Sequence, residues 1–300
     1  KCGTRIMFTI QVPASSANIG PGFDSLGVAI RRYLTLEVTR SQSWVFENQS
    51  EFLPNVTDYR DHFIYQVAQQ IADQYGSDLP PCKVLVKSDI PLARGLGSSA
   101  SAIIAGIELA NQLGQLQLTT EKKLQLATDI EGHPDNVTPA LLGGFTTTYA
   151  SDDHVDYVKI PHLEVDIALF IPHTELKTEE ARNVLPNVYE DVVATKASSA
   201  CNVMLTALLS GDLKLAGKMM EKDLFHEPYR KKLIPNYDLI KKIAKQHGAY
   251  GTVISGAGPT MMSFIPQNNG QAFTQNLTEH FPAYDLIATS IDKDGLRITH

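Results

Sequence analysis

A segment rich in glycine and serine constrains the fold of this chain more than any other feature. It runs from Pro91 to Ser101 with the sequence PLARGLGSSAS, and it leads directly into an apolar stretch that begins at Ile103 and Ile104. Glycines let the backbone approach a ligand closely, and the first turn of the helix that should follow offers unpaired N–H groups and the positive end of its dipole. The segment therefore predicts a phosphate-binding loop at a helix amino terminus.

Other loop types compete with this interpretation. A Walker A loop requires Lys after its last glycine, and no Lys lies between Lys87 and Lys122. A dinucleotide-binding loop follows its strand directly, whereas Lys87 and several further residues separate the strand expected at 84–86 from Gly95. An ordinary helix cap needs a single Ser rather than glycines in a fixed frame. A phosphate-binding loop of another kind is therefore favoured.

Length and charge exclude several classes of protein. The 300 residues are enough for two domains of ordinary size, and we place the boundary at a polar turn, Asp152-Asp153-His154, so that the domains span residues 1–155 and 156–300. A solvated turn is the favoured interpretation of that acidic cluster over a metal site. The net charge of −7 argues against a nucleic-acid partner, because such proteins normally carry a basic excess.

Cysteine usage and hydropathy bear on the compartment. Cys2, Cys82 and Cys201 lie far apart without a CxxC pair, which indicates neither a disulfide framework nor a zinc site. The most apolar stretches, such as residues 165–171, are shorter than the roughly 20 residues that span a bilayer, and the amino terminus has no signal-peptide core. We therefore expect a cytoplasmic protein without a membrane partner.

Hydrophobic periodicity predicts a mixture of strands and helices. Strands are expected over residues 8–12, 28–38, 84–86, 145–149, 165–171, 252–255 and 260–265. Helices are expected around residues 63–71, 103–110, 120–130, 192–209, 213–220 and 237–247. Gly, Pro and Asn are concentrated at 13–22 and 132–144, which predicts loops there, and a glycine turn is expected at 256–259.

Motifs in a fixed order resemble those of the GHMP small-molecule kinases. The glycine-serine loop matches that family's PxxxGLGSSA pattern without a mismatch. Residues 12–27 (VPASSANIGPGFDSLG) resemble its first motif, and residues 251–260 (GTVISGAGPT) resemble its third. Residues 131–144 (EGHPDNVTPALLGG) are similar to a segment of the members that phosphorylate homoserine, with Thr138 in place of the usual Ala. The resemblance thus covers the chain from end to end.

The resemblance implies a fold and an activity. The fold is α+β with the two-domain GHMP kinase architecture, in which a ribosomal-protein-S5-like amino-terminal domain binds ATP and a ferredoxin-like domain follows. The activity is ATP-dependent phosphorylation of the side-chain hydroxyl of L-homoserine to O-phospho-L-homoserine, in threonine biosynthesis. Mg²⁺ is the implied cofactor, and a homodimer is an expectation at the level of the family.

The resemblance assigns the glycine-serine loop to the β and γ phosphates of ATP. The residues concerned are Pro91, Leu92, Ala93, Arg94, Gly95, Leu96, Gly97, Ser98, Ser99, Ala100 and Ser101. The Ser98 hydroxyl and the Glu131 carboxylate suit Mg²⁺, which is usually held by few protein oxygens and keeps several waters. From spacing alone, a solvated carboxylate at a helix end is an equal alternative for Glu131.

The substrate residues also follow from the resemblance. Arg182 and Arg230 match carboxylate-binding arginines, and guanidinium grips a carboxylate with two parallel hydrogen bonds. Without the family, each Arg would more often be a surface residue. The remaining matches are Asp24 and Asp135 for the amino group, Asn18 and Asn136 for the hydroxyl, and Gly258 of the third motif. Turn formation is the alternative role for these Asp and Asn residues.

The sequence contains no clear general base. Neither Asp24 nor Asp135 has an adjacent Lys, so the resemblance implies catalysis by positioning, through Asn18, Asp135 and Asn136. His62 stands where relatives often have Asn, on the side expected to hold adenine.

Two rival functions make different demands on the chain. A kinase for another small alcohol should lack the pair Arg182 and Arg230. A catalytically silent metabolite-binding regulator should have lost Ser98 or Glu131, and both are present.

Overall fold

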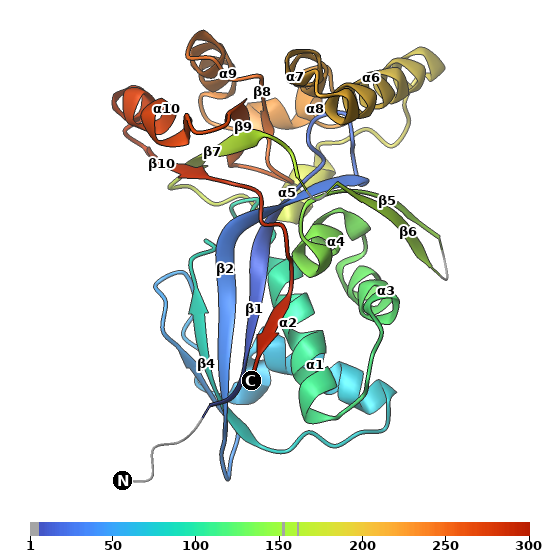
Figure 1. Cartoon of the computed structure of the whole chain (residues 1–300), viewed down its shortest axis with the longest axis vertical. Coiled ribbons are helices and arrows are strands. Elements are labelled where there is room, and N and C mark those ends of the chain that lie inside the picture. Colours follow the sequence, from blue (N-terminus) through green and yellow to red (C-terminus); the bar gives the residue numbers. More distant parts are fainter. Residues whose placement is uncertain (1–5, 152–153, 161) are drawn as a thin grey trace.

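The chain folds into two parts, which we call layers, and each consists of a sheet with its own helices. The computed structural model describes residues 6–151, 154–160 and 162–300. A larger sheet with helices on one face forms the lower part of Figure 1, and a smaller sheet with its own helices forms the upper part. The predicted α+β class is therefore confirmed. Asp152 and Asp153 of the predicted polar turn lie outside the described residues.

The larger sheet is built around two long antiparallel strands. β1 and β2 pair along most of their length, and β2 is long enough to pair with β4 through residues 34–40 and with β5 through residues 26–28. In the described part of the chain its strands are β11 (Arg297–Thr299), β1 (Ile6–Ala17), β2 (Leu26–Arg40), β4 (Cys82–Ser88) and β3 (Val45–Asn48), with β5 (Phe145–Ala150) and β6 (Val155–Ile160) joined to β2.

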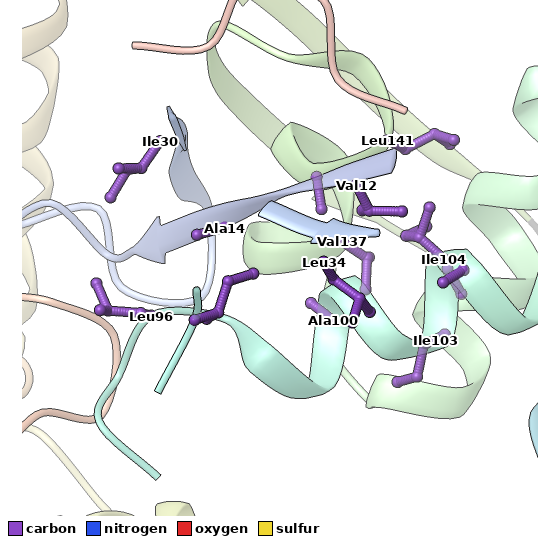
Figure 2. Packing of buried hydrophobic residues seen from close by; sticks show 14 of the residues in the cluster. Val12, Ala14, Ile30, Leu34, Leu96, Ala100, Ile103, Ile104, Val137 and Leu141 are labelled. Carbon is purple, nitrogen blue, oxygen red and sulfur yellow. The ribbon is translucent and has the colours of Figure 1, made fainter. Parts of the chain in front are cut away.

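Helices cover one face of this sheet and position the glycine-serine loop. They are η1 (Tyr59–Asp61), α1 (Phe63–Gln74), α2 (Ser98–Leu113), α3 (Thr120–Glu131) and α4 (Pro134–Leu142). Val12, Leu34 and Val137 gather around the first turns of α2, at Ala100 and Ile104 (Figure 2). Because the loop ends inside this core, the start of α2 has a fixed place.

The smaller sheet is antiparallel throughout. Its strands in the described residues run in the order β10 (Tyr284–Thr289), β7 (Val165–Pro172), β9 (Met261–Pro266) and β8 (Gly251–Ile254). The associated helices are α5 (Thr178–Asn183), α6 (Asp191–Ser210), α7 (Leu213–Met220), α8 (Glu227–Arg230), η2 (Lys231–Leu233), α9 (Tyr237–Gln246), α10 (Gly270–Leu277) and η3 (Thr278–His280).

The two layers are joined by strands and by side chains. β6 begins at the boundary predicted after residue 155 and pairs with β5, while β11 returns from the end of the chain to pair with β1. Ile167, Val253 and Phe264 of the smaller sheet belong to the same hydrophobic cluster as the larger sheet. Phe170 and Ile254 of the same sheet belong to a second cluster, so the layers share only part of their cores. The domain limits stay a prediction.

Helix α6 differs from the expectation drawn from hydropathy. By length and composition this helix could cross a membrane, with 28% of its apolar window buried in the structure. A single helix of this kind is weak evidence for a span, because helices of soluble proteins pass the same test. The expectation that every apolar stretch is too short is therefore wrong for residues 191–210.

Two segments predicted as loops are partly regular. Strand β1 continues to Ala17 because residues 14–17 pair with residues 27–30, and the turn begins only at Asn18, where φ is 71°. Residues 134–142 form helix α4, which begins at Pro134, a position where a missing N–H carries no penalty. The helices predicted at 120–130, 192–209, 213–220 and 237–247 are confirmed.

Candidate active site

A cavity of about 90 Å³ lies where the two layers meet. It is lined by residues from the β1–β2 turn, the glycine-serine loop, the end of α3, the start of α4 and the smaller layer. The predicted substrate residues that line this cavity are Asn18, Asp24, Asp135, Asn136, Arg182 and Arg230. Segments far apart in sequence therefore supply one site.

Glycines in the loop are required by close contacts. Gly97 adopts the left-handed conformation with φ of 65° just before α2, and a Cβ there would lie 2.1 Å from Ser15 Oγ. A Cβ on Gly95, where φ is 73°, would lie 2.2 Å from the carbonyl oxygen of Ser255. The Ser255 hydroxyl in turn donates to the Gly95 carbonyl over 2.6 Å. The loop is thus held between β1 and the glycine turn of the third motif.

Only part of the predicted phosphate loop faces the cavity. Ala93, Gly95, Gly97, Ser98 and Ser99 line it. Ala100 and Leu96 are buried in the core, and the buried Ser101 hydroxyl donates to Pro13 and Gly97 carbonyls. Pro91, Leu92 and Arg94 line an outer groove.

The Arg94 side chain points away from the phosphate side of the loop. Its guanidinium donates to the carbonyls of Pro172 and His173, and it pairs with Glu175. Arg94 therefore fastens the loop to the smaller layer.

Glu131 lies beside the loop at the end of α3, where Gly132 adopts φ of 88°. The Ser99 hydroxyl donates to its carboxylate over 2.9 Å. The assignment of Ser98 and Glu131 as joint Mg²⁺ ligands stays a prediction. Burial raises the pKa of Glu131, and the hydrogen bond from Ser99 opposes that rise only in part. A half-buried carboxylate of this kind gains stability from a cation.

His133 is a site residue that sequence reasoning missed. Its Nδ1 lies 2.5 Å from a carboxylate oxygen of the buried Asp135. Burial disfavours charge on the ring, but the hydrogen bond and the negative charges of Asp135 and Glu131 outweigh it and raise the pKa of His133. The available signal was a His directly before the Pro-Asp pair that opens α4.

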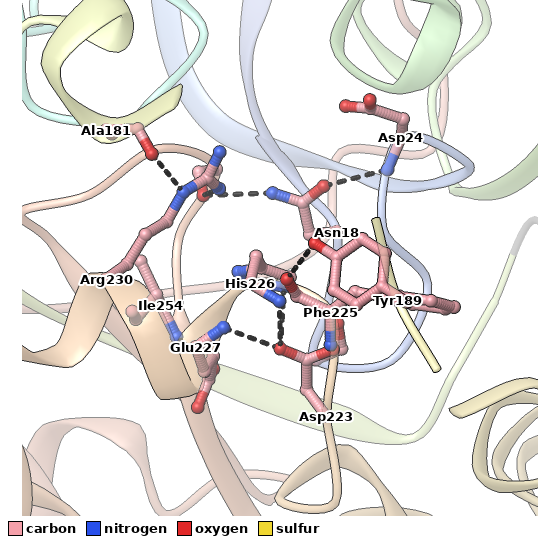
Figure 3. A network of polar contacts seen from close by, with 12 residues as sticks. Asn18, Asp24, Ala181, Tyr189, Asp223, Phe225, His226, Glu227, Arg230 and Ile254 are labelled. Atoms are coloured by element: carbon pink, nitrogen blue, oxygen red, sulfur yellow. Dashed lines mark hydrogen bonds and ion pairs between the residues drawn. The ribbon is translucent and has the colours of Figure 1, made fainter. Parts of the chain in front are cut away.

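The two predicted arginines lie in different surroundings, and Figure 3 shows those of Arg230. Arg182, which is half-buried, donates to both carboxylate oxygens of Asp24 over 2.9 and 3.3 Å. Arg230 is buried and donates to the carbonyls of Ala181 and Gly256 over 2.9 and 3.1 Å. Burial, together with the positive charge of Arg182, lowers the pKa of Arg230 to about 10. An anionic ligand would therefore stabilise the charged form of Arg230.

Asn18 and Gly258 have structural contacts beside their predicted roles. The Asn18 amide donates to the Gly256 carbonyl over 2.9 Å and accepts from the Asp24 N–H over 3.0 Å. Gly258 does not line the cavity, whereas its neighbours Gly256 and Ala257 do. The assignments of Asn18 to the substrate hydroxyl and Gly258 to the substrate stay predictions.

A second cavity, of about 310 Å³ and mostly apolar, adjoins the first. The two share Ala93, Ser98 and Ser99. His62 lines the second cavity; its ring stacks on Phe46 at 4.4 Å, and burial lowers its pKa to about 4. The ring at this position is therefore neutral near pH 7.

Asp24, His133 and Asp135 place ligand atoms within 4.8 Å of one another. These groups already have partners, since His133 bonds Asp135 and Arg182 pairs with Asp24. Mg²⁺ prefers oxygen ligands and is rarely bound through imidazole. Among the described residues, Glu131 with the loop serines is the better match for that ion.

Comparison with known proteins agrees with this geometry. The family model described as the GHMP kinases N terminal domain matches residues 62–144, and that described as GHMP kinases C terminal matches residues 204–283. The homoserine kinase of Oceanobacillus iheyensis is 49% identical over 97% of this chain and 98% of its own length. That of Bacillus pumilus is 44% identical over 98% and 95%.

Solved structures give the same result at the level of the fold. The crystal structure of homoserine kinase from Cytophaga hutchinsonii superposes with a TM-score of 0.83 at 28% identity, covering 100% of both chains. Mevalonate kinase of L. major superposes with a TM-score of 0.70 at 17% identity, covering 97% of each chain. At that identity the second likeness concerns the fold alone.

Proposed function

The chain belongs to the GHMP kinase family, and from that premise we propose that it transfers the γ-phosphoryl group of ATP to the side-chain hydroxyl of L-homoserine. The product is O-phospho-L-homoserine, a step of threonine biosynthesis. One observation carries the proposal: a single cavity joins the glycine loop and Glu131 to an Asp and Arg pair and to a second, buried Arg. Such a site can hold a triphosphate next to a small zwitterion.

The arrangement of the two cavities supports ATP as the phosphoryl donor. The backbone N–H groups at the start of α2 suit the β and γ phosphates. The base then extends past Ser98 and Ser99 into the apolar cavity beside His62. Nucleobases bind well in such cavities, because their faces are apolar.

Glu131 fits a divalent cation at the phosphates. Its half-buried carboxylate accepts from a hydroxyl of the loop over 2.9 Å, which is the oxygen-rich donor set that Mg²⁺ accepts. Glu131 and Ser99, with Ser98 next to them, would hold the ion. Mg²⁺, when bound there, would neutralise charge on the β and γ phosphates during transfer.

The opposite side of the cavity complements a zwitterionic amino acid. Arg230 and Arg182 suit the substrate carboxylate, and Asp24 suits its ammonium group. Asn136 lies at the start of α4, and its amide oxygen accepts a hydrogen bond from Ser15 over 3.0 Å. Asn136 suits the substrate hydroxyl, which must face the phosphates. In the free chain, Asp24 pairs with Arg182. Substrate binding would replace this ion pair with two others, one between Asp24 and the ammonium group and one between the arginines and the carboxylate.

Catalysis by positioning is consistent with the state of Asp135. Its carboxylate is engaged by His133, whose raised pKa favours the protonated ring. Because His133 holds this carboxylate in place, Asp135 serves to orient groups rather than to remove the hydroxyl proton. Transition-state stabilisation then rests on the loop and the cation.

The setting of the enzyme is part of the proposal. We expect a cytoplasmic enzyme whose ligands are ATP, Mg²⁺ and L-homoserine, with neither nucleic acid nor a membrane as a partner. The net charge of −7 supports the first exclusion. A homodimer remains a family-level expectation.

A substrate panel tests the function. ADP release with Mg-ATP is measured for L-homoserine, L-serine, L-threonine, mevalonate and shikimate, in wild type, Arg230→Leu and the exposed control Arg40→Leu. We expect strong preference for L-homoserine, with kcat/KM reduced about 100-fold in Arg230→Leu only, since loss of a charged, desolvated contact costs roughly 2–5 kcal/mol. Preference for another alcohol would contradict the substrate, and ATP binding without any turnover would favour a regulator.

A further inference from the structure

Phe23, next to Asp24 in the β1–β2 turn, contacts both arginines of the site. The guanidinium carbon of Arg230 lies 5.5 Å from the centre of the Phe23 ring, and that of Arg182 lies 5.9 Å from it. Both distances are within the range at which a cation is attracted to an aromatic face. One ring therefore contacts both positive groups assigned to the substrate carboxylate.

The ring is itself held from another side. His226 stacks on Phe23 with centres 5.4 Å apart and an angle of 26° between the planes. The His226 Nε2 donates to the Gly20 carbonyl over 2.9 Å, and Asp223 accepts from the His226 backbone N–H. Because His226 is fully buried, Phe23 rests on a support of fixed orientation.

Two guanidinium groups in one cavity repel each other, and the lowered pKa of Arg230 reflects burial and that repulsion. Asp24 offsets the charge of Arg182, but among the described residues Arg230 donates only to carbonyl oxygens. A carboxylate between them would neutralise the arginines and compete with the substrate. An aromatic ring attracts both cations through its quadrupole and leaves their charge available.

We propose that Phe23 is a positioning residue that holds Arg182 and Arg230 together for the substrate carboxylate, with His226 as its support. This inference rests on the proposed function and assigns a specificity role to a side chain that donates no hydrogen bond. Phe23 acts on the affinity for the amino acid, because the arginines lie on the acceptor side of the cavity. Phe23 is not among the described residues that line the cavity beside the phosphate loop.

The test compares ring and non-ring variants. Phe23→Leu keeps an apolar side chain and removes the quadrupole, whereas Phe23→Tyr keeps the ring. Phe225→Leu is the matched control. The Phe225 ring lies 6.5 Å from that of Phe23, and among the described residues it is the Phe23 ring that the two guanidinium groups face. KM for L-homoserine, KM for ATP and kcat are measured for each variant, together with its thermal midpoint.

We expect Phe23→Leu to raise KM for L-homoserine about tenfold, from the loss of two partly desolvated cation–π contacts. Its kcat and its KM for ATP should stay within about twofold of wild type, and Phe23→Tyr and Phe225→Leu should resemble wild type. An unchanged KM for L-homoserine in a folded Phe23→Leu, or equal defects in the Leu and Tyr variants, would overturn the proposal. Failure of the wild type to phosphorylate L-homoserine contradicts the proposed function instead.

Discussion

The two ends of the cavity are built on different principles. The phosphate side is made of backbone around Gly95 and Gly97, and its conformation is fixed by the core beneath α2. The acceptor side is made of charged side chains from separate segments, which pair with one another in the free chain, as Asp24 does with Arg182. A backbone site tolerates no added atom, whereas a side-chain site can lose one group and keep its shape. Substitutions at the two ends should therefore fail in different ways.

Gly97→Ala should have the largest effect. The new Cβ would meet Ser15 Oγ at 2.1 Å in a left-handed conformation, so the loop must shift. A displacement of about 1 Å near the reacting groups costs on the order of 100-fold in rate, and we expect at least that loss in kcat. Gly76→Ala is the control, since φ there is 62° but nothing lies within 4 Å. Activity measured alongside unfolding should show Gly76→Ala slightly less stable and fully active; equal activity losses would contradict the claim.

Glu131→Gln should come next. The amide keeps an oxygen for the Ser99 hydroxyl but removes the negative charge that a cation needs. We expect kcat to fall roughly 100-fold, comparable to the loss of one charge-stabilising group in an active site, with little change in KM for L-homoserine. Steady-state kinetics across a range of Mg²⁺ concentrations measures this, with the exposed Glu279→Gln as control. A change confined to KM for L-homoserine would move Glu131 to the acceptor side.

Arg182→Lys probes the acceptor side more gently. The ammonium keeps the charge but loses the fork that binds both oxygens of a carboxylate, as Arg182 now does with Asp24. KM for L-homoserine should rise about fivefold to tenfold while kcat and KM for ATP are nearly unchanged. A fall in kcat at saturating L-homoserine would show that the two ends of the cavity are not separable.

The pair His133 and Asp135 should give the smallest effect, and it depends on pH. The pKa of His133 is raised in the folded chain, so its stabilising contribution is complete below the ordinary value near 6.5 and disappears as pH rises through the folded value. His133→Gln should therefore lower the free energy of unfolding more at pH 6 than at pH 9, by roughly 1 kcal/mol. Urea unfolding at both pH values measures the difference, and an equal or reversed difference is the contrary result.

The sequence predicts the residues of the phosphate side more completely than the contacts of the acceptor side, for a physical reason. Gly95 and Gly97 belong to one short, contiguous segment of the sequence. Glycines in that pattern indicate a loop at the start of a helix. The sequence does not show which serine hydroxyl contacts Glu131. Ser98 and Ser99 are neighbours on α2 and point in directions about 100° apart. Which of them meets Glu131 depends on how α3 packs.

The acceptor side shows the same limit. Arg182 and Arg230 were found through the resemblance, but their pairing with Asp24 and with backbone carbonyls is a property of the assembled layers. His133 was missed because a His beside Pro and Asp is also ordinary turn chemistry. The proline and glycine content of residues 132–144 likewise predicts a loop in place of helix α4. Pro134 is compatible with that helix because it occupies the first helical position.

The most direct test of the account is phosphorus NMR of the wild type with Mg-ATP and L-homoserine. We predict that the γ-phosphate signal of ATP decreases while a phosphomonoester signal appears in equal amount, with the mass of phosphohomoserine in the same sample. The phosphate side and the acceptor side would then act on one reaction. Release of inorganic phosphate alone, or no loss of ATP, would contradict the account.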